Sequence, residues 1–416
     1  SEMCIRDRYF GDNQSIGLLS HIKKRLPYGM DDQWMVFSHY TERGWTVDNL
    51  WHIFTDFYGG QYAPLAFLSY LVLYAGFGYD PFYFHMFSLL LHIGCVCLVW
   101  KLISSLLRVH GGVSEKQILY VNFITTLLFA VHPINVEAVA WISALKVLLY
   151  AFFYLLGLLC YLRYIRTSKI FYYVLTIGCF LCSFWGKEQA VTFPLALLIV
   201  DWFTNRNMKN LEVWSEKMSF LIMAFFFGII TVLSQGKGPY EMIFPLYQRL
   251  LFGCFALVEY ITKSLLPVNL NFFYPFPIVL GEEPPLHYYL YPVVLLFLMG
   301  WIIAYRNNRY LVFGVLLFLV NLLFSIHLFN MSRHAIVADR YMYLSYVGIA
   351  FLIANGIWWL RKRLSYFKAA LVFLFFYCFF LSVYTFHYTK KWENTTMVKK
   401  YTKEVLEKRL NGSNHL

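Results

Sequence analysis

The chain has 416 residues, of which 59% are hydrophobic and only 14% are charged. A soluble domain carries about a quarter charged residues, so this composition excludes an ordinary soluble globular protein. The net charge is +12, but Lys and Arg lie between apolar runs and near the C-terminus rather than in one stripe, which argues against nucleic-acid binding. Apolar runs long enough to cross a bilayer recur along the chain. We therefore expect an all-α polytopic membrane protein.

The part of the chain before the first long apolar run is polar and aromatic. Residues 1–8 are interpreted as a sequence scar and set aside. Residues 9–81 are predicted to form an outer loop that holds an acidic motif, Asp31–Asp32, and an interfacial helix over the short apolar segment 62–79, which is equally compatible with crossing the membrane. Asp is favoured at helix starts, so a helix cap is the plain alternative for these two residues.

Ten spanning helices are predicted within 82–388, and their loop charges orient them. The spans are 82–107, 118–131, 147–165, 170–185, 189–203, 218–234, 288–304, 311–328, 342–360 and 367–388. Lys and Arg gather in alternate loops, which should face the cytoplasm. The segment 247–266 is also apolar, but it carries Arg249, Glu259 and Lys263, so we expect it to return to the outer side without crossing. Residues 389–416 then form an outer-side tail, and we expect that an eleventh, N-terminal helix, which would end just before Met30, is missing from this sequence.

The predicted outer loops hold an unusual set of polar residues, namely His132, Glu137, Lys146, Lys187, Glu188, Asp339, Arg340 and Tyr341. Charges at a membrane edge are costly and often functional. Structural alternatives remain: a turn residue for His132, a snorkelling turn for Lys187–Glu188, and a capping ion pair for Asp339–Arg340. His85 and His92 are expected to be core histidines. Seven of the eight cysteines lie in apolar runs as packing residues, and no spacing typical of a zinc site occurs.

Together these residue types suit the transfer of a sugar from a lipid phosphate. A carboxylate can act as the base for an acceptor hydroxyl. Arg and Lys can hold a phosphate leaving group and neutralise the charge that develops on it. A site at the outer membrane edge fits a donor whose lipid tail stays in the bilayer.

Short motifs in a fixed order carry a family resemblance. They are Met30-Asp-Asp-Gln33; Tyr62-Ala-Pro-Leu-Ala-Phe-Leu-Ser69; Phe84-His85 with Leu89-Leu-Leu-His92; His132-Pro-Ile-Asn-Val-Glu-Ala-Val-Ala-Trp-Ile-Ser143; Lys187-Glu-Gln-Ala-Val-Thr-Phe-Pro194; Leu265-Leu-Pro-Val-Asn-Leu270 with Tyr274-Pro275; and Ala338-Asp-Arg-Tyr-Met-Tyr-Leu344. Each is weak alone, but their number and order are fairly specific. The sequence resembles the GT-C glycosyltransferases that carry tetratricopeptide repeats, both the bacterial proteins of that kind and the animal transmembrane-and-tetratricopeptide O-mannosyltransferases.

This resemblance implies a GT-C-like bundle and roles for the residues that match the motifs. Asp31 or Asp32 would be the catalytic base; Arg340, Lys187 and Lys146 would bind the donor phosphate. The cavity would be lined by His132, Glu137, Glu188, Asp339 and Tyr341. A divalent cation at Asp31 and Asp32 stays open.

The implied reaction is inverting transfer from a polyprenyl-phosphate sugar, with mannose a candidate, to a protein Ser/Thr or glycan hydroxyl. The site would face the periplasm from a bacterial inner membrane, or the lumen from an endoplasmic reticulum membrane. The tail over 389–416 would lead into tetratricopeptide repeats. Asn330, Asn394 and Asn411 fit glycosylation sequons and fall on the predicted outer side.

Two other classes of function predict different features in the sequence. A transporter or flippase of lipid-linked intermediates should show two related halves and charges near mid-membrane. A non-catalytic membrane scaffold should use the tail and tolerate loss of Asp31, Asp32 and Arg340. The charges instead cluster toward one predicted surface and no repeat relates the halves, which favours glycosyl transfer.

Overall fold

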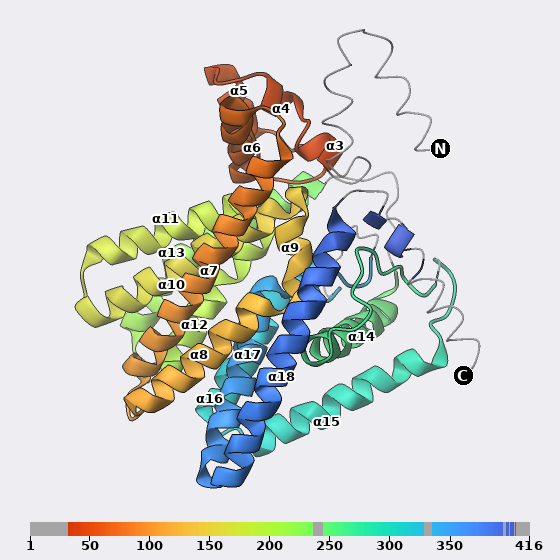
Figure 1. The fold of residues 1–416 in the computed structure, drawn as a ribbon. Helices are drawn as coiled ribbons and strands as arrows, with labels where there is room; N and C mark the ends of the chain where they lie inside the picture. The colour runs from red at the N-terminus through yellow and green to blue at the C-terminus, as the bar shows by residue number, and fades with distance from the viewer. Residues whose placement is uncertain are drawn as a thin grey trace.

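The computed structural model describes residues 32–235, 244–278, 280–327, 335–393, 397–398, 400–402 and 404. Asp31, residues 1–8 and the three sequon asparagines lie outside the described residues. Within them, regular structure consists of α-helices and short 3-10 helices, with two isolated β-bridges. The all-α prediction is therefore confirmed for this part of the chain (Figure 1).

Sixteen α-helices follow one another along the described residues. They are α3 (Asp32–Met35), α4 (His39–Glu42), α5 (Val47–Thr55), α6 (Pro64–Phe77), α7 (Pro81–His110), α8 (Glu115–Val131), α9 (Val136–Ala140), α10 (Leu145–Thr167), α11 (Ile170–Gly186), α12 (Phe193–Phe203), α13 (Leu211–Gln235), α14 (Leu246–Leu265), α15 (Leu290–Ala304), α16 (Arg309–Leu322), α17 (Met342–Trp359) and α18 (Leu364–Thr389). The 3-10 turns are η2 (Pro133–Asn135), η3 (Ile142–Ala144), η4 (Glu188–Thr192), η5 (Leu286–Tyr289), η6 (Asp339–Tyr341), η7 (Leu360–Lys362) and η8 (Lys390–Trp392).

Each of the ten predicted spans coincides with a helix, but several helices are short. Six helices of the described chain are long and apolar enough to cross a membrane, or seven if α8 and the segment Pro133–Ala140 form one span bent by 51°. The predicted run over 189–203 divides into η4 and the 11-residue α12. Pro194 explains the division, since it has no backbone N–H and is tolerated only in the first turn of α12. The chain is thus a polytopic helical membrane protein.

The core lies around α10, while the outer helices expose apolar side chains. Of the apolar window in Ile142–Thr167, 78% is buried, against 6% in Leu286–Ala304 and 11% in Leu364–Trp392. This distribution suits a bundle whose surface meets lipid. α16 and α17 pack so closely that a Cβ added to Gly348 would lie 2.5 Å from the Gly314 carbonyl oxygen. Glycine at this position therefore permits the close approach. Small residues at such crossings let helix backbones approach each other in membranes.

Helix α14 is not among the helices of the described chain that pass the length and hydropathy test for a span. It packs beside α15 and α17. Its return to the outer side stays a prediction. Its charged residue Lys263 is buried and donates a hydrogen bond to the Tyr274 hydroxyl at 2.6 Å. Lys263 also lies 3.8 Å from Glu259, so these two charges are paired inside the protein, whereas Arg249 Nε is buried without a hydrogen-bond partner in the described part of the chain.

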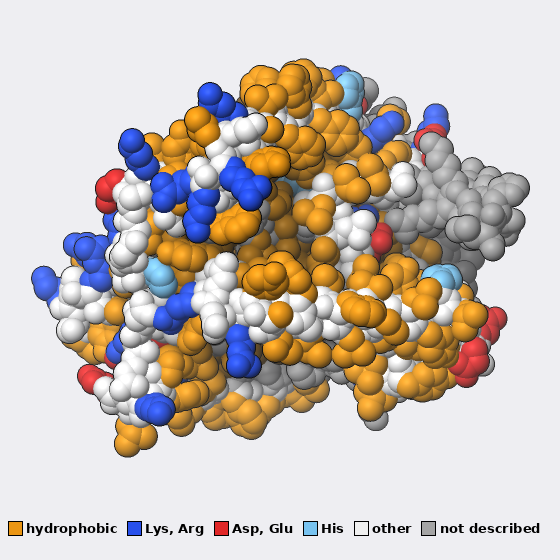
Figure 2. Space-filling view, turned by 90° about the horizontal axis from the view of Figure 1, so that it is seen from below, with side chains coloured by type: hydrophobic (Ala, Val, Ile, Leu, Met, Phe, Trp, Pro, Cys, Tyr) orange, Lys and Arg blue, Asp and Glu red, His pale blue; other side chains and the backbone are white. Residues whose placement is uncertain are grey.

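The bundle has two polar ends, which we name after a buried aspartate in each. The Asp32 end, at the top of Figure 1, holds α3 to α6 and the short helices η2, α9 and η3. The Asp201 end holds the C-terminus of α12 and the basic loops. There Arg309 donates hydrogen bonds to Asn205 and to the Trp202 carbonyl, and His110 lies 2.7 Å from the Phe203 carbonyl oxygen. Figure 2 shows many Lys and Arg side chains on the face seen from below.

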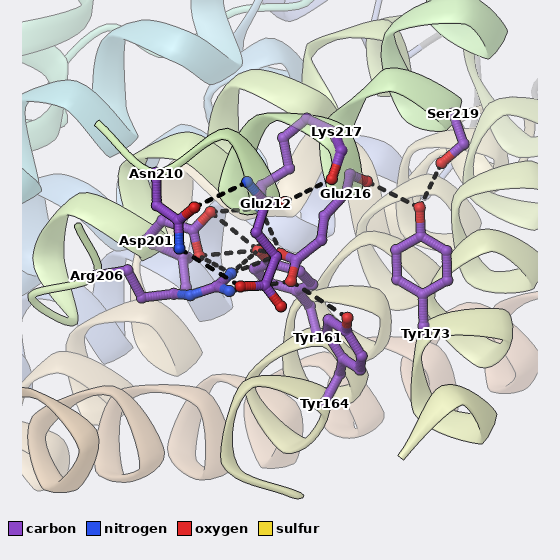
Figure 3. A network of polar contacts seen from close by, with 12 residues as sticks. Tyr161, Tyr164, Tyr173, Asp201, Arg206, Asn210, Glu212, Glu216, Lys217 and Ser219 are labelled. Atoms are coloured by element: carbon purple, nitrogen blue, oxygen red, sulfur yellow. Dashed lines mark hydrogen bonds and ion pairs between the residues drawn. The ribbon is translucent and has the colours of Figure 1, made fainter. Parts of the chain in front are cut away.

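A closed network of ion pairs holds the Asp201 end together (Figure 3). Arg206 makes a two-pronged contact with Glu216, at 2.6 and 2.9 Å. Lys217 lies 2.5 Å from Asp201 and 3.1 Å from Glu216. The Tyr161 hydroxyl donates to Asp201 at 2.8 Å. Two acids and two bases therefore satisfy one another where α10, α12 and α13 meet.

Candidate active site

Three short connections of the chain meet at the Asp32 end. They are the segment of η2, α9 and η3, the turn that opens η4, and η6. The first begins because His132 Nδ1 accepts a hydrogen bond from the Ile134 N–H at 3.2 Å, while Pro133 starts the 3-10 turn. α9 packs against η6, and α3 packs against η3. Sequence-distant outer loops are thus brought into contact.

Asp32 is fully buried and is held by the segment 141–143. Its Oδ2 accepts a hydrogen bond from Trp141 Nε1 at 3.1 Å. Its Oδ1 accepts from the Ser143 backbone N–H at 2.9 Å and from the Ser143 hydroxyl. A helix cap would bond to its own first turn, whereas these donors lie more than a hundred residues away. The capping alternative for Asp32 therefore does not describe its main contacts.

Arg340 is oriented by Glu137, which is fully buried. Arg340 Nη1 lies 2.5 Å from Glu137 Oε1, and the Arg340 backbone N–H donates to Oε2 at 2.7 Å. Asp339 accepts a hydrogen bond from the Tyr274 hydroxyl at 2.9 Å and lies 3.7 Å from Lys263 Nζ. The alternative of a capping Asp339–Arg340 ion pair is therefore wrong for the described contacts, because each residue pairs elsewhere.

Lys187 is a buried cation that approaches Arg340. Lys187 is only 3% exposed, and its Nζ lies 4.8 Å from the centre of the Tyr341 ring. The Arg340 guanidinium lies 5.1 Å from the same ring. Across the described ranges, the Lys187 ammonium makes no hydrogen bond or ion pair, although its backbone N–H bonds to the Ser183 carbonyl. The snorkelling alternative is wrong, since a snorkelling ammonium would be exposed.

Burial and neighbouring cations tune Lys187. Burial lowers its pKa from 10.5 to about 8, and the positive charges of Lys146 and Arg340 act in the same direction against Glu188 and Tyr341. A buried charge is unfavourable unless it is compensated. This position therefore favours an anion brought by a ligand, and a phosphate suits two adjacent cations.

Lys146 lies at the start of α10, near the acidic motif. It is 6% exposed, and its Nζ lies 2.5 Å from the Gln61 amide oxygen and 3.6 Å from the Met35 sulfur. Its charge acts on Lys187, although no contact between them is recorded. Lys146 thus links the cationic cluster to the segment that carries Asp32.

The remaining predicted residues divide into two groups. Glu188 is half-buried beside Lys187, and the Tyr341 ring lies close to both cations. His132 is buried, caps η2 and stacks on Tyr346, with ring centres 4.2 Å apart. The turn role of His132 is therefore confirmed, and none of its recorded contacts joins it to Lys187 or Arg340. His92, bonded to the Tyr343 hydroxyl at 2.7 Å, is the core histidine expected.

Several residues that build this site were not singled out from the sequence. Trp141 and Ser143 hold Asp32, Gln61 bonds Lys146, and Lys263 with Tyr274 fixes Asp339. Trp141 and Ser143 lie inside the motif that runs from His132 to Ser143, but the sequence does not indicate that their partner is Asp32. Lys263 was visible as a charge in an apolar run, which is costly in a membrane and hence often functional.

A cation site is not evident in the described part of the chain. No group of three or more His, Cys, Asp or Glu residues is placed to hold a metal there. Both oxygens of Asp32 accept hydrogen bonds from N–H or O–H donors. Asp32 thus fits a carboxylate that is positioned by donors better than one that binds a metal.

The fold and this cluster define a polytopic membrane protein with a cationic site at one end of its bundle. Among known proteins, the chain is 32% identical over 189 residues to mouse protein O-mannosyl-transferase TMTC2, a match that covers 41% of this chain and 21% of the relative. Human TMTC2 is 33% identical over 189 residues, covering the same shares. Drosophila melanogaster Tmtc3 is 28% identical over 172 residues, or 37% of this chain and 18% of the relative.

These matches confirm the resemblance to transmembrane-and-tetratricopeptide O-mannosyltransferases. The chain spans about a fifth of the length of the relatives that it matches. No family model and no solved structure matches the chain.

Proposed function

We propose that this chain is a glycosyltransferase that moves a sugar from a polyprenyl-phosphate donor to the hydroxyl of a protein or glycan acceptor on the outer side of its membrane. Mannose is the first sugar to test, because the similar proteins are named O-mannosyl-transferases. One observation carries the proposal: the Lys187 side chain is buried, lies beside Arg340, and its ammonium has no hydrogen bond or ion pair in the described chain.

The donor phosphate would lie against Lys187 and Arg340. Tyr341 keeps the two cations on one ring, and Glu137 fixes the Arg340 guanidinium, so neither needs to be reoriented when the donor arrives. Cations that are held in place stabilise the charge that develops on a leaving group more effectively than mobile ones. Lys146 adds positive potential from the side of the acidic motif.

The reaction would be a direct displacement. The acceptor oxygen attacks the anomeric carbon as the bond between that carbon and the phosphate oxygen breaks, and the polyprenyl phosphate leaves with the electron pair. The acceptor proton passes to a carboxylate of the Asp31–Asp32 motif. Attack from the face opposite the leaving group inverts the anomeric carbon. Trp141 and Ser143 would hold the motif in register with the cations.

Purified full-length chain, incubated with a panel of polyprenyl-phosphate sugars and candidate acceptors, tests this proposal. We expect release of polyprenyl phosphate with at least one sugar, and loss of that release in Lys187→Met. Lys169→Met, at an exposed position outside the cluster, is the matched control and should behave as wild type. Parallel reactions with EDTA test whether a divalent cation is needed. Equal release by Lys187→Met and wild type would overturn the phosphate assignment, and no release with any sugar would overturn the transfer reaction.

A further inference from the structure

Trp141 is the point where the acidic motif meets the tail that follows α18. Its indole N–H donates to Asp32, and its ring lies 5.2 Å from the Arg340 guanidinium. The Phe272 ring meets it edge-on at 5.2 Å, and the Trp392 ring lies 6.4 Å away at an interplanar angle of 31°. One side chain therefore touches the motif, the cationic cluster and two further segments.

The tail is seated on this part of the molecule. Trp392 is 3% exposed and Val398 is 4% exposed. Thr402 Oγ1 donates to Asn271 Oδ1 at 2.8 Å. Trp392 and Val398 belong to a separate hydrophobic cluster with Val136, Trp141, Ala144, Leu270 and Tyr388. The described part of the tail thus packs against Trp141, in the segment that holds Asp32.

Because Trp141 donates a hydrogen bond to Asp32, the position of the Asp32 carboxylate should respond to how the tail packs against Trp141. One carboxylate oxygen accepts a hydrogen bond from the Trp141 indole, while the other accepts from Ser143 two residues later. A Trp side chain has two rotatable bonds, and its N–H reaches an acceptor only at one setting of both. The rings of Phe272 and Trp392, which come from two different segments of the chain, pack against the indole and restrict that setting. Lys187 packs on Tyr341, and Arg340, although its guanidinium also lies 5.2 Å from the Trp141 ring, is held by two hydrogen bonds to Glu137.

We propose that Trp392 is a positioning residue for the acidic motif, acting on Asp32 through Trp141. This inference rests on the proposed glycosyl transfer for its catalytic consequence. The tail then sets the geometry of the base side of the reaction, while the phosphate side keeps its own supports. Removing the Trp392 ring should reduce turnover and leave donor binding unchanged.

The experiment compares Trp392→Ala with Trp392→Phe and with Trp358→Ala in the full chain. Trp358 is a matched control because it is 9% exposed and packs on Tyr120 and Phe367, away from Trp141. Two quantities are measured: the kinetics of sugar transfer, and the hydrogen exchange of the Trp141 indole proton by NMR of protein labelled at the tryptophan indole nitrogens. Trp141→Phe assigns the resonance.

We expect Trp392→Ala to lower kcat on the order of tenfold with an unchanged KM for the donor, because small displacements of a catalytic group are costly. The indole proton should exchange faster in the same variant. Trp392→Phe should keep both kcat and the indole exchange rate near the wild-type values, and Trp358→Ala should change neither quantity. Unchanged indole exchange in Trp392→Ala, or a kcat loss no larger than that of Trp358→Ala, would overturn the inference. If wild type transfers no sugar, the proposed function fails, but the exchange measurement still decides whether Trp392 positions Trp141.

Discussion

The two polar ends of the bundle use the same pair of residue types in different ways. At the Asp201 end, Lys217 Nζ lies 4.7 Å from the centre of the Tyr161 ring and pairs with both Asp201 and Glu216. At the Asp32 end, Lys187 Nζ lies 4.8 Å from the Tyr341 ring and has no ion pair in the described chain. The comparison separates a lysine that closes a structural network from one that is available to a ligand.

A third lysine sharpens the contrast. Lys263 lies 4.2 Å from the Tyr274 ring, and carboxylates of Glu259 and Asp339 lie 3.8 and 3.7 Å from its Nζ. A lysine over a tyrosine ring is thus a recurrent packing unit in this protein. Only at Lys187 among these three is the carboxylate missing, so the missing partner is what distinguishes the candidate phosphate site.

The largest effect should come from opening the closed network. Lys217→Met leaves Asp201 buried with one counter-charge fewer, and breaking a buried pair costs about 3–5 kcal/mol. The free energy of unfolding in detergent should fall by that amount. Arg108→Met is the control, because its pair with Glu115 is exposed on both sides and is worth about 1 kcal/mol or less. Equal losses in the two variants would contradict a structural role for the network.

A lysine-to-methionine substitution at the Asp32 end should affect activity rather than stability. Lys187→Met should lower the rate of sugar transfer about a hundredfold, as loss of one preorganised charge-stabilising group does. It should not lower the free energy of unfolding, because it removes a buried ammonium that no recorded ion pair compensates. Thermal unfolding and transfer assays on one preparation measure both. A stability loss as large as that of Lys217→Met would show that Lys187 is structural.

The pH dependence of donor binding tests the same contrast in the wild-type chain. The pKa of Lys187 is lowered to about 8 by burial, so the ammonium that binds phosphate is lost above that pH. Donor affinity should be flat below pH 8 and fall about tenfold per pH unit above it. Stability moves the other way: the folded pKa lies below the ordinary value of 10.5, so this residue adds stability as pH rises from 8 to 10.5.

Lys187→Arg is the control for this titration, since a guanidinium stays protonated throughout the range. Isothermal titration of the donor between pH 7 and 9.5 provides the measurement. An alkaline fall that persists in Lys187→Arg would assign the titration to another group.

The apolar runs predicted where the helices lie, but not which loops touch. Every predicted span overlaps a helix, since long apolar runs leave the backbone few other choices in a membrane, but only six or seven helices of the described chain are long and apolar enough to cross one. The division of 189–203 into η4 and α12 was missed, although Pro194 was visible. Arg340 and Lys187 were predicted to share a site, and the structure brings both onto the Tyr341 ring. The bonds from Trp141 and Ser143 to Asp32 span more than a hundred residues, and helical periodicity carries no information about such pairs.

The smallest effect is expected at the Glu137–Arg340 pair of the candidate site, which resembles the Glu216–Arg206 pair of the Asp201 end. Glu137 pairs with Arg340 through both oxygens, as Glu216 does with Arg206, but here one partner must also face the ligand. Glu137→Gln keeps one acceptor and loses the charge, so donor affinity should fall by about 1 kcal/mol, or about fivefold. Donor titration measures this, with Glu188→Gln as the half-buried control that makes no recorded hydrogen bond to Arg340. A larger loss in Glu188→Gln than in Glu137→Gln would mean that Arg340 is not the cation that Glu137 prepares for the phosphate.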